Sequence, residues 1–389
     1  MPRAILLACL AFAAPAAAQD TARVAVAFTM GVRGQATGWD YAADEPAWGG
    51  LTRAATVLDS LRRAHPDHLV VADGGDLLTG STFAAWLARN PRTPHPLVEA
   101  LNLAGYDVAT PGPRDAALGA ERMGAAYAEA RFPVVSASLV RAGGDGPALR
   151  PWAVIRRGPL RIAVTGIVTG TVSATGSLRA RSLDEALPTL QAMRGEADAV
   201  VVFAHLAPGD RARLAELGAL ADLVVTADMR GPNGVWVADL DAVRAQGRWT
   251  VRAGAPRLLV LGLTPEQPRL LAGLADVHAE ARAGLAKPLG RAGDTFSARM
   301  ARAEPVPLVE LLHRVQRRHT GATLSLVPIA SVDVALPLGD LRRRDLVALD
   351  PRQSPVRAVR VTGEQLKDVL ETSARYYRLD AQRRPAVAP

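Results

Sequence analysis

Cysteine is almost absent from this 389-residue chain, because Cys9 is the only one. Cys9 lies in an N-terminal stretch that reads as a cleavable leader, so the rest of the chain can form neither a disulfide nor a cysteine metal site. Catalysis by a thiolate is excluded for the same reason. A chain of this length can bury a core large enough to fold without covalent cross-links.

Lysine is also scarce, since Lys287 and Lys367 are the only two, and the formal net charge of +8 comes from arginine. The arginines are scattered along the chain, and aromatic residues make up only 4% of it. Proteins that bind nucleic acids gather their basic residues and interleave them with aromatic ones. We therefore expect no nucleic acid polymer among the partners of this protein.

Long apolar runs are missing beyond the N-terminus. Residues 1–18 combine Arg3, an apolar run from Ala4 to Ala14 and the small residues Ala16 to Ala18, which is the pattern of a secretory signal peptide. No later stretch reaches the ~18 consecutive apolar residues that a membrane-spanning helix needs. The sequence thus predicts a secreted, periplasmic protein without a membrane span.

Short apolar runs alternate with helical patterns over residues 22–264. The runs that predict strands are Val24–Phe28, Leu69–Asp73, Val108–Thr110, Val134–Ser138, Ile162–Thr165, Val200–Phe203 and Leu223–Val225. The segments with helical spacing are Leu51–Arg63, Pro96–Ala104, Ala120–Arg131, Leu183–Arg194 and Asp210–Leu217. This alternation predicts one large α/β layered domain.

A smaller unit follows a connecting helix and linker over residues 265–303. In residues 304–378 we expect a helix, strands at Leu324–Ile329 and Val356–Val361, and a second helix that begins with a capping box of Thr362 and Gln365. The Pro- and Ala-rich tail of residues 379–389 is predicted to be disordered.

Asp76 is the most informative charged residue of the large domain. It follows the apolar run Leu69–Asp73 and the glycine pair Gly74-Gly75, so a buried strand is expected to deliver its carboxylate to the carboxyl edge of a sheet. Taken alone, this pattern is also typical of an ordinary turn.

Several motifs together resemble the secreted metallophosphoesterases, namely bacterial 5′-nucleotidases and periplasmic 2′,3′-cyclic-nucleotide phosphodiesterases. The residues that carry the resemblance are Gly50-Leu51-Thr52-Arg53, Gly75-Asp76-Leu77, Ala104-Gly105-Tyr106-Asp107, Phe132-Pro133-Val134-Val135, Ala204-His205, and Val361-Thr362-Gly363-Glu364-Gln365. The resemblance implies a four-layer α/β/β/α sandwich, followed by a short α+β C-terminal domain that is abbreviated relative to the family.

The resemblance also implies two metal ions, but this sequence keeps few of the residues that bind them in the family. Asp76 and His205 stand at ligand positions, whereas Gly31-Val32-Arg33 replaces a metal-binding Asp-x-His. Arg114 takes the position of the family's catalytic histidine, so no catalytic residue is assigned. The last ligand motif becomes Ala227-Asp228-Met229-Arg230. One retained carboxylate at the first metal position cannot hold a divalent ion tightly.

Three interpretations of these substitutions remain open. Arg33, Arg114 and Arg230 could replace the metal ions as the positive charge of the cleft and bind an anion. Their surplus charge would then suit a sulfate-like or phosphodiester group. Alternatively, Arg33 and Arg230 are internal salt-bridge partners of Asp76 and Asp228. In the third interpretation Asp76, His205 and Asp228 form a mononuclear metal site.

The sequence therefore predicts a secreted relative of the 5′-nucleotidases and cyclic phosphodiesterases with a degraded dimetal site and little or no activity. Its partner would be a small anionic, phosphate-like ligand or a periplasmic protein, and it would need no cofactor. The alternative is an active phosphoester hydrolase of nucleotide catabolism that uses one divalent metal (manganese, iron or zinc) at Asp76, His205 and Asp228.

Overall fold

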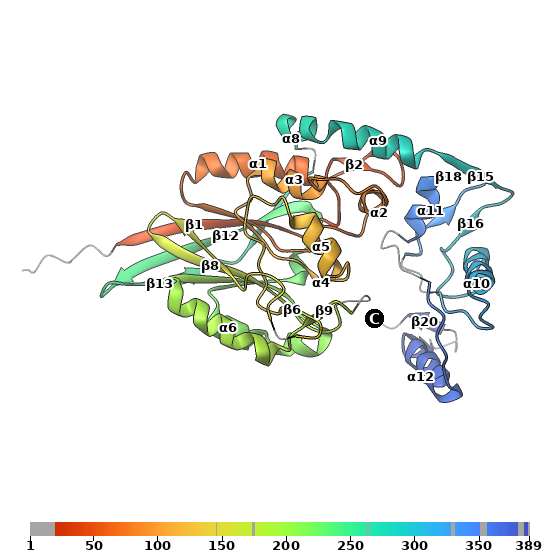
Figure 1. Ribbon diagram of the computed structural model, residues 1–389. Coiled ribbons are helices and arrows are strands. Elements are labelled where there is room, and N and C mark those ends of the chain that lie inside the picture. The colour runs from red at the N-terminus through yellow and green to blue at the C-terminus, as the bar shows by residue number, and fades with distance from the viewer. Residues whose placement is uncertain are drawn as a thin grey trace, which may run out of the picture.

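The computed structural model describes residues 20–144, 146–172, 176–262, 264–327, 331–350, 356–379 and 385–387. The signal peptide expected at residues 1–18 lies outside the described residues. Two β-sheets face each other in the larger part of the molecule, and helices cover the outer face of each sheet (Figure 1). This arrangement confirms the predicted four-layer α/β/β/α class.

The first sheet has six strands and is built around β1. Its order is β13 (Arg248–Ala253), β12 (Gly231–Ala245), β1 (Thr21–Met30), β4 (Leu69–Asp73) and β5 (Val108–Ala109), with β14 (Arg257–Val260) also paired to β12. Strand β1 runs parallel to β4 and antiparallel to β12. The second sheet has the order β11 (Leu223–Thr226), β10 (Ala199–His205), β8 (Leu160–Val168) and β7 (Ala153–Arg157).

Helices and short ribbons complete the sandwich. They are β2 (Trp39–Asp40) paired with β3 (Glu45–Pro46), β6 (Leu139–Arg141) paired with β9 (Leu178–Ala180), α1 (Leu51–Ala64), α2 (Thr82–Arg89), α3 (Pro96–Ala104), α4 (Pro113–Ala116), α5 (Ala120–Tyr127), α6 (Leu183–Glu196), α7 (Leu214–Leu220), and the 3₁₀ turns η1 (Pro208–Arg213) and η2 (Ala227–Met229). In Figure 1, α1 and α3 lie on one side of the sheets and α6 on the other.

The alternation of β1 divides its side chains between two cores. Val24, Val26 and Phe28 belong to the cluster between the sheets, where Phe28 meets Phe203 edge to face with ring centroids 5.5 Å apart. Ala25 and Ala27 belong instead to the cluster under the helices. Because successive side chains of a strand point to opposite faces, a fully apolar strand such as β1 can hold two layers together.

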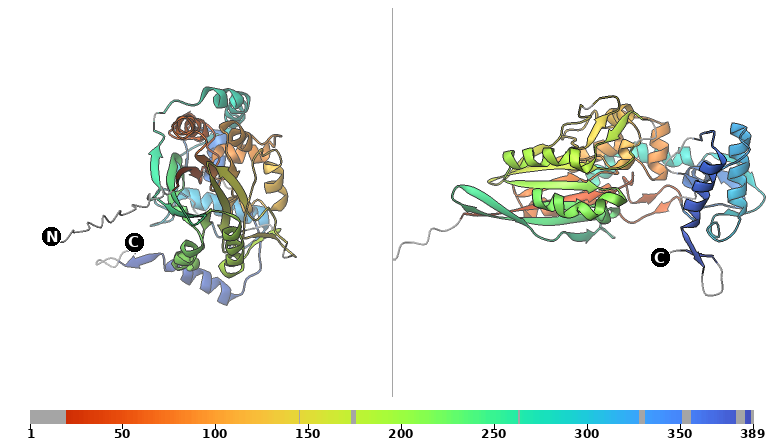
Figure 2. Two further views of the ribbon diagram at one scale, coloured as in Figure 1. Left: turned by 90° about the vertical axis from the view of Figure 1, so that its left-hand side faces the viewer. Right: turned by 90° about the horizontal axis from the view of Figure 1, so that it is seen from below.

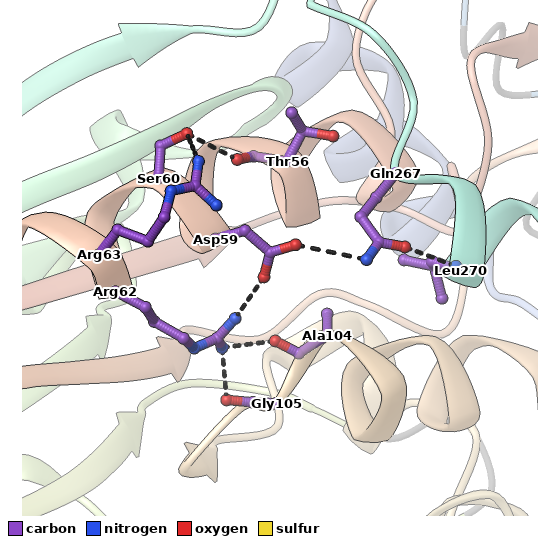
Figure 3. Close-up of polar contacts among 9 residues, drawn as sticks. All are labelled: Thr56, Asp59, Ser60, Arg62, Arg63, Ala104, Gly105, Gln267 and Leu270. Atoms are coloured by element: carbon purple, nitrogen blue, oxygen red, sulfur yellow. Dashed lines mark hydrogen bonds and ion pairs between the residues drawn. The ribbon is translucent and has the colours of Figure 1, made fainter. Parts of the chain in front are cut away.

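The connecting segment forms two helices, α8 (Pro268–Gly273) and α9 (Ala275–Leu285), rather than one. Gln267 caps α8 by accepting a hydrogen bond from the Leu270 amide, and its side chain also donates to Asp59 on α1 (Figure 3). Asp59 in turn forms an ion pair with Arg62. These contacts fix the start of the connection against the large domain.

The C-terminal unit is small and lies at one end of the sandwich (Figure 2). Its elements are β15 (Pro288–Ala292) paired with β18 (Gly339–Arg342), β16 (Phe296–Ser297) paired with β17 (Ala335–Leu336), α10 (Pro307–Thr320), α11 (Arg343–Leu349), α12 (Gly363–Ala374), and β19 (Tyr377–Leu379) paired with β20 (Pro385–Val387). The predicted capping box of Thr362 and Gln365 opens α12. Strands β15 and β16 pair within this unit, although the sequence predicts a connecting helix and linker over residues 265–303.

Several predicted elements differ from the structure. Residues 134–138 form only isolated bridges, and no strand is present at 324–327 or 356–361; residues 328 and 329 lie outside the described part. Val359 is 76% exposed, so the alternating pattern there has no sheet to cover it. Strand β20 falls in the tail that was expected to be disordered. In the described part of the chain, no helix combines the length and apolar character that a bilayer crossing requires.

Candidate functional site

Five of the predicted site residues lie at or just beyond the carboxyl ends of strands. Arg33 follows β1, Asp76 follows β4, Arg114 begins the α4 turn after β5, His205 ends β10, and Arg230 follows β11 and the η2 turn. In parallel sheets these strand ends meet at one edge, where open α/β folds bind their ligands.

Backbone contacts bring these loops together. The Gly31 amide donates to the Gly75 carbonyl at 2.7 Å, and the Arg33 amide donates to the Asp76 carbonyl at 2.9 Å. A Cβ atom added to Gly31 would lie 2.6 Å from the Cβ of Arg230, so this glycine lets the β1 and β11 loops touch. The loops therefore converge as the family resemblance implied.

Asp76 is held at the centre of this convergence. It has a left-handed backbone with φ of 58° and is completely buried. Its Oδ1 accepts a hydrogen bond of 3.0 Å from the Arg114 amide, which fixes the plane of the carboxylate. Its Oδ2 is buried and has no hydrogen-bond partner among the described residues. The nearest cationic group is Nε of Arg114, at 3.7 Å, which is an ion pair but too long for a hydrogen bond.

The three arginines form a cluster of positive charge. Burial lowers the pKa of the half-buried Arg33, and the neighbouring guanidinium groups of Arg114 and Arg230 lower it further, while Asp76 opposes the shift. Nε of Arg33 is buried without a hydrogen-bond partner in the described chain. The interpretation that Arg33 and Arg230 form salt bridges with Asp76 and Asp228 is not what the structure shows, because Asp76 pairs with Arg114 and neither expected pair occurs between the described residues.

His205 lies next to the loop that carries Asp76, with only 5% of its surface exposed. Its Nε2 is 2.7 Å from the Gly74 carbonyl, and since a carbonyl oxygen can only accept, Nε2 carries the proton. Burial lowers the pKa of the imidazole, against the opposing effect of Asp76, so the ring is neutral near pH 7. Its Nδ1 is then a buried acceptor without a partner among the described residues.

Two further carboxyl groups lie behind Asp76. Asp73 accepts hydrogen bonds from the Thr29 hydroxyl and the Gly75 amide. Asp115 accepts from the amides of Leu77, Leu78 and Gly112. Burial raises the pKa of both Asp73 and Asp115 to about 7, and mutual repulsion among the buried carboxylates adds to the shift. The oxygens of both carboxyl groups therefore accept hydrogen bonds from within the fold, and each group has a pKa near neutral pH.

Sequence reasoning passed over Asp73 and Tyr127 at this site. Tyr127, at the end of α5, is buried, and its hydroxyl group lacks a partner in the described residues. Burial and the nearby carboxylates of Asp115, Asp73 and Asp76 raise its pKa. The position of Asp73 at the end of a wholly apolar strand was a usable signal, whereas nothing local to Tyr127 in the sequence marks it.

The residues present do not fit a metal centre. Between the described residues, no group of three His, Cys, Asp or Glu side chains is placed to hold a metal ion. Asp76 and His205 offer two free donor atoms, but Asp228 is exposed in η2 and does not complete the set. The guanidinium groups of Arg33 and Arg114 beside Asp76 would also repel a dication.

Comparisons with known proteins identify the fold. Residues 283–387 match the family model described as 5′-nucleotidase, C-terminal domain. The structure superposes on that of a Staphylococcus aureus protein assigned as a 5′-nucleotidase, with a TM-score of 0.78 and 19% identity. The match covers 94% of this chain and 79% of the other. For a 5′-nucleotidase precursor from Thermus thermophilus the TM-score is 0.61 at 17% identity, over 85% of this chain and 74% of that one.

The chain has the fold of the 5′-nucleotidase metallophosphoesterases. The sequence comparison is consistent with this fold. The chain is 24% identical to the 2′,3′-cyclic-nucleotide 2′-phosphodiesterase/3′-nucleotidase of Haemophilus influenzae over 89% of this chain. It is 22% identical to the protein of the same name from Salmonella typhimurium over 84% of this chain. The aligned parts span 66% and 64% of those relatives' lengths. Proteins of that family depend on metal ions, whereas the described residues of this site do not fit a metal centre.

Proposed function

We propose that this protein is a metal-independent, anion-binding relative of the 5′-nucleotidases, with little or no hydrolytic activity. The observation that carries the proposal is the cluster of Arg33, Arg114 and Arg230, in which one carboxylate, Asp76, faces three guanidinium groups. Asp76 and the partly ionised Asp73 and Asp115 offset only part of these three positive charges near neutral pH, which leaves a surplus that a bound anion would neutralise. Guanidinium groups can hold an oxyanion by paired hydrogen bonds without any metal.

We also place the protein outside the cytoplasm. The support is the signal-like pattern of residues 1–18 and the relationship to a Thermus thermophilus protein described as a precursor. The ligand would then be a small phosphate-like anion of the periplasm, and a protein partner that presents such a group would satisfy the same chemistry.

The arginine cluster can be tested by thermal shift. Phosphate added at constant ionic strength should raise the melting temperature saturably, relative to chloride. Replacing Arg33 or Arg230 by alanine should weaken binding by about tenfold to a hundredfold, because each substitution removes a charge-assisted hydrogen bond. Arg252→Ala, at an exposed arginine on β13, serves as the matched control and should leave binding unchanged. If no anion stabilises the protein beyond the effect of chloride, the proposal is wrong.

A second candidate function is phosphoester hydrolysis through one metal at Asp76, His205 and Asp228. One observation favours it, namely that Asp76 Oδ2 and His205 Nδ1 are both buried without partners among the described residues. These two atoms fall short of the three or more protein ligands that a tightly held transition metal usually has.

Metal analysis separates the two candidates. Protein purified without a histidine tag should carry well under one equivalent of manganese, iron or zinc, and a chelator should leave its melting temperature unchanged. A stoichiometric metal that raises the melting temperature, and that is lost in His205→Asn, would instead establish the second candidate.

A further inference from the structure

We propose that Asp76 selects the ligand by accepting a hydrogen bond from it, so that the site prefers an oxyanion that still carries an acidic proton. This inference rests on the proposed anion-binding function and narrows its ligand class. Inorganic phosphate and the monoanion of a phosphate monoester fit this class. Sulfate and phosphodiesters, which the surplus charge alone would suit, do not.

The orientation of the Asp76 carboxylate is the first step. Its Oδ1 is occupied by the Arg114 amide at 3.0 Å, and a Cβ atom on Gly112 would approach Oδ1 to 2.2 Å. The loop around Gly112 therefore encloses Oδ1 and fixes it. The other oxygen, Oδ2, is left pointing toward the Arg114 side chain, which is about one-third exposed and borders the solvent.

The lack of an internal donor for Oδ2 is the second step. Nε of Arg114 is 3.7 Å away, the Thr29 hydroxyl is bonded to Asp73, and the Leu78 amide is bonded to Asp115. The hydroxyl group of Tyr127 is buried near these carboxylates, but it makes no hydrogen bond to Oδ2. A buried carboxylate oxygen without a hydrogen bond is costly, so it is expected to meet a donor when the site is filled. His205 Nδ1 is a second buried acceptor without a partner in the described chain.

The complementary requirement comes from the arginines. Nε of Arg33 is a buried donor without a described partner, and the three positively charged guanidinium groups favour the binding of negatively charged oxygens. A ligand that satisfies both sets of atoms must present anionic oxygens and a proton donor on the same small group. A singly protonated phosphoryl group does so, since its second pKa is near 6 for a monoester. Sulfate and phosphodiesters are unprotonated at neutral pH, so they would leave Oδ2 without a donor and facing like charge.

The test compares anions on the full, chelator-treated protein by isothermal titration at constant ionic strength. Inorganic phosphate should bind about tenfold to a hundredfold more tightly than sulfate or dimethyl phosphate, the range expected when a buried acceptor is left unsatisfied. Phenyl phosphate should bind more weakly relative to sulfate as the pH rises from 5.5 to 8, because it loses its proton in that interval. Sulfate keeps one charge state over this pH range, so any change in its affinity reports a change of charge on Asp73, Asp115 or His205.

Asp76→Asn is the decisive variant. Asparagine tolerates the left-handed backbone at this position, its Oδ1 can keep the hydrogen bond from Arg114, and its Nδ2 would place a donor where Oδ2 was. The preference should then disappear or reverse in favour of sulfate. Asp228→Asn is the matched control: it removes one exposed carboxylate near Arg230, so both anions should bind equally more tightly and their ratio should not change.

Each outcome bears on a different claim. Equal binding of phosphate and sulfate by the wild-type protein would overturn the inference while leaving the proposed anion-binding function intact. Failure of every anion to bind would remove both. A phosphate preference that persists in a folded Asp76→Asn protein would show that another residue makes the selection, and the role of Asp76 would be wrong.

Discussion

Purified protein supplied with manganese is expected to hydrolyse a nitrophenyl phosphate ester or a 2′,3′-cyclic nucleotide at least about ten-thousandfold more slowly than an active relative. The proposed function leads to this expectation, because the family resemblance implies that Arg114 takes the position of the catalytic histidine and that only Asp76 and His205 remain of the metal ligands. Each lost acid–base or electrostatic group typically costs two to four powers of ten. In the described part of the chain, no third His, Cys, Asp or Glu side chain is placed to complete a metal site with these two.

The assay should be read together with two variants. Arg114→His alone should not restore turnover, because it returns one group to a site that still lacks its metal ligands. Any residual rate should be the same in Asp76→Asn, which would identify it as contamination. Activity within tenfold of an ordinary relative that is abolished in Asp76→Asn would contradict the proposal and favour the single-metal hydrolase.

Phe203→Ala is expected to lower the free energy of unfolding by about 3–5 kcal/mol. Phe203 is completely buried between the two sheets, where its ring meets Phe28 at an interplanar angle of 76°. Truncation removes apolar surface and leaves a cavity that strands fixed on both sides cannot fill. Urea denaturation followed by circular dichroism measures the loss.

The same substitution should also weaken anion binding. Phe203 lies two residues before His205 on β10, and a Cβ atom on Gly74 would approach its ring to 2.7 Å, so the ring supports the loop that carries Asp76. Val154→Ala, at a 40% exposed position on the edge strand β7 of the same sheet, is the control and should change stability by less than about 0.5 kcal/mol. A loss below about 1 kcal/mol for Phe203→Ala would mean that the inter-sheet core can collapse around the gap.

The sequence by itself determined the central strands of the sandwich. Leu69–Ala72 and Val200–Phe203 are short, continuous apolar runs rich in valine, which favours a strand buried on both faces. It did not reveal β12, in which Asp239 and Asp241 alternate with the buried Leu240 and Ala242 because one face of the strand lies toward solvent. The same alternation predicted a strand at Val356–Val361, where the structure has none. Whether an alternating segment becomes a strand depends on a partner edge, which only the tertiary structure provides.

For the site, the order of motifs was enough to place Arg33, Asp76, Arg114, His205 and Arg230 at one edge of the sheets. The partners of these residues were decided by the tertiary structure. Asp76 bonds the amide of Arg114 rather than the side chain of Arg33. Asp73 accepts from the Thr29 hydroxyl and the Gly75 amide, and Asp115 accepts from the amides of Leu77 and Leu78 in the loop after β4. Burial then decides the charge of each group, because desolvation shifts the pKa of a carboxyl group. The size of that shift depends on neighbours from every surrounding loop. Sequence spacing carries no information about those neighbours, and so the free oxygen of Asp76 could be seen only in the folded protein.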